Sequence, residues 1–67
     1  MYAQIGDYRI GDIVEFGYHG TPRLVKIALI FPDAFLGLTM AGDFTTTTGK
    51  ARFKFEKLEC PKIRVQA

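Results

Sequence analysis

The chain has 67 residues, of which 48% are hydrophobic and 24% charged, and its formal net charge at pH 7 is +2. A chain of this length forms one domain and buries only about 60% of its unfolded surface, which leaves little room for an enclosed pocket. The hydrophobic and charged fractions exclude a disordered chain.

Cys60 is the only cysteine, so an intramolecular disulfide is excluded and a reducing compartment is favoured. The longest apolar run, residues 27–31, spans five residues. A membrane-crossing helix needs about 20. The N-terminus lacks the residue order of a signal peptide. We therefore expect a soluble, cytoplasmic protein with no membrane partner.

The first half of the chain predicts three strands. Residues 13–18 have the β-branched and aromatic content of a strand, and turn formers at 19–22 predict a four-residue loop before a second strand at 23–31. A break at 32–34 precedes a third strand at 35–41. Its side chains alternate, so Leu36, Leu38 and Met40 share one face.

The second half predicts two more strands after a loop at 42–49, which contains the threonines at 45–48. In the strand at 50–58, Phe53, Phe55 and Lys57 fall on the core side, and Arg52, Lys54 and Glu56 fall on the solvent side. A short last strand is expected at 62–65. Five short strands without an amphipathic helix predict an all-β fold, a small five-stranded barrel over residues 1–67. The order of these strands resembles that of SH3-like barrels.

Charge is unevenly distributed along the chain. Residues 50–67 hold six bases and two acids, net +4, whereas residues 1–49 hold three bases and five acids, net −2. A basic strand interleaved with aromatic residues is suited to phosphate neutralisation and base stacking. Alternatively, the same bases only keep the outer side of the strand solvated and protect it as an edge strand.

Several segments resemble known families. The entry phrase at 9–16 resembles that of SH3-like barrels. From Ile13 onward the chain resembles a WYL-type domain, with matching segments at 14–20, 35–40 and 52–58, although Phe35-Leu36 stands where that family has Trp-Tyr. The resemblance implies a small SH3-like β fold and a regulatory module that binds single-stranded nucleic acid or a nucleotide-like ligand through basic residues. It makes Arg23 and Arg52 the best candidates, with Tyr18 and Lys54 nearby on paired strands.

The residue content argues against catalysis. The chain has no serine, and its single histidine, His19, and single cysteine supply neither a metal site nor an activated nucleophile. We expect no enzyme activity, no cofactor and no metal.

Three kinds of partner follow for a binding module. The favoured prediction is a small regulatory protein that contacts nucleic acid or a nucleotide-like ligand through a basic strand. The alternatives are a stand-alone protein-binding adaptor or inhibitor, of the size that phages and mobile elements encode, and a self-assembling Sm-like subunit that forms a homo-oligomer. The candidate ligand-binding residues are Tyr18, Arg23, Lys26, Arg52, Lys54 and Arg64.

Overall fold

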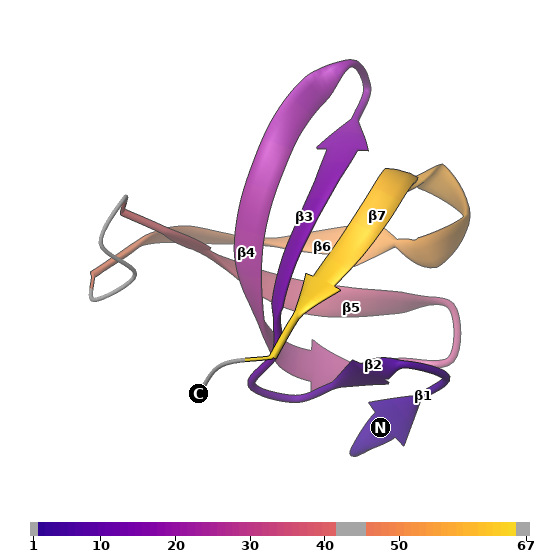
Figure 1. Ribbon diagram of the computed structural model, residues 1–67. Helices are drawn as coiled ribbons and strands as arrows, with labels where there is room; N and C mark the ends of the chain where they lie inside the picture. Colours follow the sequence, from indigo (N-terminus) through magenta and orange to yellow (C-terminus); the bar gives the residue numbers. More distant parts are fainter. Residues whose placement is uncertain (1, 42–45, 66–67) are drawn as a thin grey trace.

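The computed structural model describes residues 2–41 and 46–65, and most of them form strands (Figure 1). A small antiparallel pair precedes a five-stranded antiparallel sheet with the order β6-β5-β4-β3-β7. A single turn of 3-10 helix, η1, separates the last two strands. The elements are β1 (Gln4–Ile5), β2 (Tyr8–Arg9), β3 (Ile13–Tyr18), β4 (Thr21–Ile30), β5 (Ala34–Met40), β6 (Thr47–Lys54), η1 (Phe55–Lys57) and β7 (Glu59–Arg64). The all-β prediction is confirmed.

The β3–β4 hairpin is tighter than the sequence predicted. β3 has the predicted bounds, but the connecting loop has two residues, His19 and Gly20, and not four. Both have a positive φ, 51° and 76°. Such a pair of left-handed residues is the mark of a type I′ turn, whose twist matches that of the flanking strands. Thr21 and Pro22 therefore belong to β4.

The C-terminal third also departs from prediction. β6 starts within the predicted loop at 42–49, of which residues 42–45 lie outside the described part of the chain. The predicted strand at 50–58 is wrong beyond Lys54, because η1 follows. There the Phe55 ring packs against Tyr8, with 5.0 Å between the ring centroids. Lys57 is exposed, so its expected position on the core side is wrong.

The predicted position of the last strand is also wrong, since β7 begins three residues earlier than the expected start at 62. Glu59 pairs with Gly17 and Lys62 pairs with Glu15, so two residues of β7 lie opposite one residue of β3. This arrangement is a β-bulge, and Cys60 within it has a φ of 48°.

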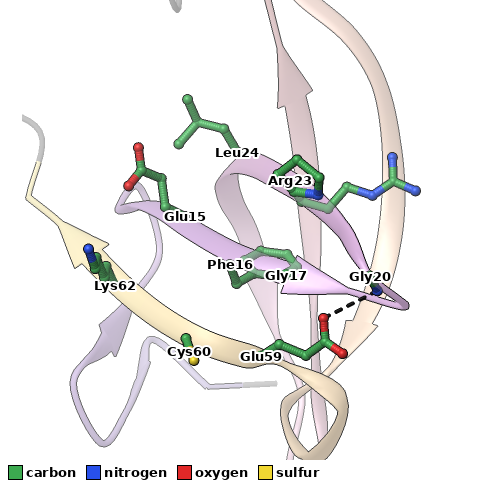
Figure 2. Close-up of a pocket in the computed structure, with 10 residues that line it drawn as sticks. Glu15, Phe16, Gly17, Gly20, Arg23, Leu24, Glu59, Cys60 and Lys62 are labelled. Carbon is green, nitrogen blue, oxygen red and sulfur yellow. Dashed lines mark hydrogen bonds between the residues drawn. The ribbon is translucent and has the colours of Figure 1, made fainter.

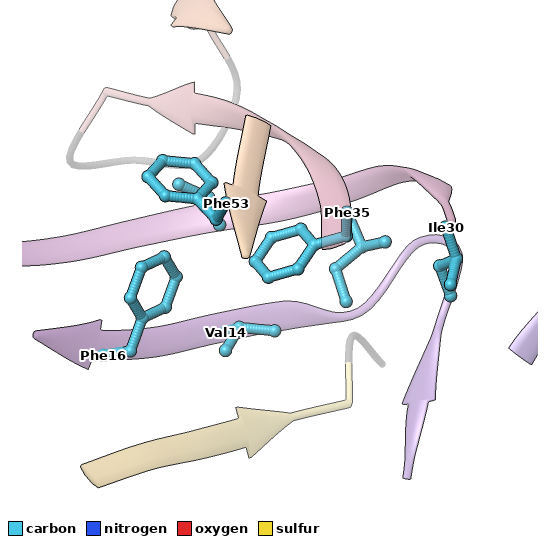
Figure 3. Packing of buried hydrophobic residues seen from close by; sticks show 7 residues of the cluster. Val14, Phe16, Ile30, Phe35 and Phe53 are labelled. Carbon is cyan, nitrogen blue, oxygen red and sulfur yellow. The ribbon is translucent and has the colours of Figure 1, made fainter. Parts of the chain in front are cut away.

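The hydrophobic core covers one face of the sheet, here called the inner face (Figure 3). Phe53 is only 4% exposed, so its predicted core position is confirmed, whereas Phe55 is half-buried at the margin. In a flat sheet, β3 and β6 would be about 14 Å apart, because two strands separate them. The Phe16 and Phe53 rings nevertheless approach to 5.0 Å between centroids. The buried cluster is Val14, Phe16, Val25, Ile27, Ile30, Phe35 and Phe53.

The sheet is therefore strongly curled around its core. Among the described residues no pairing joins β6 to β7, so the closed barrel stays a prediction. No helix in this part of the chain is long and apolar enough to span a membrane.

Candidate functional site

The opposite face of the sheet, here called the outer face, carries most of its positive charge. Directly paired residues in antiparallel strands project to the same side, so the register assigns each base to a face. Six of the seven bases in the five-stranded sheet lie on the outer face with two acids, a balance of +4. These bases are Lys26, Lys50, Arg52, Lys54, Lys62 and Arg64, and the acids are Glu15 and Glu59.

Three of these cations occupy one row across the whole sheet. The paired positions run from Lys50 to Leu38, then Lys26, Ile13 and finally Arg64. Neighbouring strands lie about 4.8 Å apart, so successive cations in this row attach to backbones about 10 Å apart. We call these five residues the cation row. Its bases alternate with apolar positions, of which Leu38 is half-buried and Ile13 is buried.

Two outer-face arginines make ion pairs. Arg52 contacts Asp33 at 3.2 Å and its guanidinium lies 4.8 Å from the centre of the Phe31 ring. Arg64 contacts Glu15 at 2.7 Å. Both arginine side chains are more than half exposed, and ion pairs of this kind contribute at most about 1 kcal/mol. An anion of higher charge density, such as a phosphate, can therefore compete for either arginine.

Two of the residues predicted from sequence lie elsewhere. Arg23 pairs with Phe16, so it projects from the inner face, beyond the edge of the core. Tyr18 is also on the inner face, and its ring lies edge-on to Phe53 at 5.2 Å. Tyr18 lies near Arg23 on a paired strand, as expected, because β3 pairs with β4. Arg52 and Lys54 share β6, which pairs with neither β3 nor β4.

The structure gathers the other four predicted residues, Lys26, Arg52, Lys54 and Arg64, on the outer face. It adds Lys50 and Lys62, which the sequence reasoning left out of the site. A signal for both was available, because each precedes a predicted site arginine by two residues, the spacing that keeps side chains on one face.

A groove of about 600 Å³ lies on the outer face where β3, β4 and β7 meet (Figure 2). Glu15, Leu24 and Lys62 line it, and Glu59 lies at one end. The Glu59 carboxylate accepts a hydrogen bond of 3.2 Å from the Gly20 N–H, which joins β7 to the hairpin turn. Arg23 also lines the groove, so its two acids, Glu15 and Glu59, are balanced by two bases, Arg23 and Lys62. Without a net positive charge, the groove is a less favourable position for a phosphate than the cation row.

Gly17 leaves space in this groove for the Glu59 side chain. A Cβ atom there would lie 2.7 Å from the Glu59 Oε1 atom, well inside van der Waals contact. The absence of a side chain lets the glutamate cross β3 and reach the hairpin turn.

Comparisons with protein-family models, with curated proteins and with solved structures found no match. The geometry of the outer face is therefore the basis for a functional assignment.

Proposed function

We propose that this protein is a non-catalytic binding module whose outer face contacts single-stranded nucleic acid. One observation carries the proposal: the register collects six of the sheet's seven bases on the face opposite the core. If the bases served solvation alone, they would not need to gather on one face. The inner-face residue Arg23 is exposed as well, so the inner face can also hold an exposed base.

The cation row supplies the affinity in this proposal. Lys50, Lys26 and Arg64 neutralise phosphates along a track that crosses all five strands, and each neutralised phosphate releases condensed counterions. Between them, the half-buried Leu38 offers an apolar contact to a sugar or base. Few directional hydrogen-bond donors other than the charged groups lie along the row, so binding is expected to depend weakly on base sequence.

We further propose that the curled sheet is an SH3-like barrel. Two features support this: the contact of Phe16 with Phe53 across two intervening strands, and the pairing of the last strand, β7, with the first strand of the sheet, β3. The WYL-type resemblance remains a prediction. Within it, Arg52 belongs to the proposed binding face and Arg23 does not.

Fluorescence anisotropy with labelled single-stranded DNA and RNA tests the proposal, with Lys26→Gln/Lys50→Gln as the informative variant. The matched control is Arg23→Gln/Arg9→Gln, which also removes two positive charges, but at positions that are not on the outer face of the sheet. For single-stranded nucleic acid, log K falls with log salt with a slope of about −0.7 for each phosphate contact. The first variant loses two contacts, so its slope should be shallower than that of the wild type by about 1.4. The control should keep the wild-type slope. Equal losses in the two variants would show a nonspecific response to net charge and would reject the outer-face assignment.

A further inference from the structure

The free edge of β6 is the largest unpaired backbone surface of the five-stranded sheet. β5 pairs with β6 along one side, and among the described residues no strand pairs with its other side. Every residue of β6 except Phe53 is exposed. β7, at the opposite edge, carries Pro61 and the bulge at Cys60, both of which oppose the addition of another strand. The edge of β6 has no comparable interruption between Gly49 and Lys54.

The direction of the backbone groups along β6 follows from its ladder with β5. The Phe55 N–H donates to the Asp33 carbonyl at 3.1 Å, in register with the pairs Lys54–Ala34 and Phe53–Phe35. Hydrogen-bonded and non-hydrogen-bonded pairs alternate in an antiparallel ladder. Residues 55, 53, 51 and 49 therefore direct their N–H and C=O groups to β5. Lys50, Arg52 and Lys54 lie between them and direct theirs to the free edge.

The residues with free backbone groups are thus the three bases of β6. An added strand would place its own side chains directly beside theirs on the outer face, where unlike charges stabilise a pair and like charges destabilise it. Pairing between two copies of β6 would set bases against bases, so this edge opposes self-association. Acidic residues at alternate positions of the added strand complement it.

The inner-face side of the same edge is open. The inner-face positions beside the buried Phe53 are Gly49, which has no side chain, and Ala51, and both are exposed, so there is space at this edge. Apolar side chains at the intervening positions of an added strand would extend the core there. The edge therefore matches a segment that alternates acidic and apolar residues.

We propose that the β6 edge binds an extended acidic segment of another protein by strand addition. Main-chain hydrogen bonds to Lys50, Arg52 and Lys54 hold the segment, and its alternate acidic side chains select it. This partner is distinct from the nucleic acid proposed for the outer face. The two sites share basic side chains, but only strand addition uses the backbone of β6.

A synthetic peptide in which three glutamates alternate with valines tests the proposal. One control peptide has lysine in place of glutamate, and a second has the same composition with the three glutamates adjacent. Only the alternating acidic peptide should bind. Bound peptide should slow amide hydrogen exchange at Lys50, Arg52 and Lys54 by at least about tenfold, since these N–H groups become hydrogen-bonded. Binding without this protection would overturn the proposal, and so would the absence of binding at millimolar peptide.

Two substitutions at Lys50 separate backbone pairing from charge. Lys50→Gln and Lys50→Pro both remove the charge, but only proline removes the outward N–H, and it leaves the ladder with β5 intact. Lys50→Pro should bind the peptide several-fold more weakly than Lys50→Gln, whereas an oligonucleotide held by side chains should not distinguish them. Equal peptide affinities in the two variants would reject strand addition. If Lys50→Pro fails to fold, the exchange measurement on the wild-type protein still decides.

Discussion

Truncation of Phe53 tests the proposed arrangement of the curled sheet most sharply. Phe53 is 4% exposed, and its ring centroid lies 5.0 Å from that of Phe16, 5.2 Å from that of Tyr18 and 5.5 Å from that of Phe35. Phe53→Ala removes the contacts that join β6 to β3 across the core. Truncations of buried phenylalanine cost about 3–5 kcal/mol.

This loss is large compared with the expected stability of the domain. At about 0.05–0.15 kcal/mol per residue, a chain of this size has a free energy of unfolding of roughly 3–10 kcal/mol. Phe53→Ala should therefore be partly or fully unfolded at 25 °C. Phe53→Leu preserves most of the volume and should cost less than about 1.5 kcal/mol, so it provides a variant that remains folded.

Phe55→Ala is the matched control, because Phe55 is half-buried in η1. Full burial of phenylalanine contributes about 1.5–3 kcal/mol, so this truncation should cost about half as much. Urea unfolding followed by far-ultraviolet circular dichroism suits a chain without tryptophan. The interpretation of Phe53 as the residue that joins β6 to β3 would be refuted if Phe53→Ala cost less than Phe55→Ala.

Three further substitutions test individual contacts. Gly17→Ala should lower the urea midpoint, because its Cβ would lie 2.7 Å from the Glu59 Oε1 atom, and the penalty should shrink in a Glu59→Ala background. Asp12 is buried and accepts a hydrogen bond of 3.1 Å from the Arg9 N–H, so Asp12→Ala should cost about 1.5–3 kcal/mol in the same assay, and a loss below 0.5 kcal/mol would contradict this role. Burial raises the pKa of Tyr8 above 10.0, which favours its protonated form in the folded state. The protonated Tyr8 therefore contributes to stability below pH 10, and this contribution should be lost as the pH rises through the pKa of the folded state. Unfolding midpoints compared at about pH 9 and pH 11 should therefore fall less in Tyr8→Phe than in the wild type.

The local alternation of side chains was sufficient to predict much of the sheet. Residues 13–18 alternate clearly, and β3 has the predicted bounds. Phe53 was assigned to the core because it follows the same alternation. The change from β6 to η1 was not predictable from a local pattern, since the Phe55 position depends on Tyr8, far away in the sequence. The pair of strands β1 and β2 was missed because two-residue strands carry almost no periodic signal.

The candidate site was predictable as a set of bases but not as a surface. Arg23 and Lys26 are three residues apart on one strand with no bulge between them, so they must project to opposite faces. That spacing was available in the sequence and separates Arg23 from the others. The alignment of Lys50, Lys26 and Arg64 was not available, because it depends on the register of four strand pairs.

Nuclear magnetic resonance titration of the isotope-labelled protein with a single-stranded oligonucleotide tests the central claim most directly. The outer-face assignment predicts side-chain shift changes along the cation row, at Lys50, Leu38, Lys26 and Arg64, with little change at the inner-face Arg23. Changes concentrated at Arg23 and the hairpin turn, with the cation row unaffected, would contradict it.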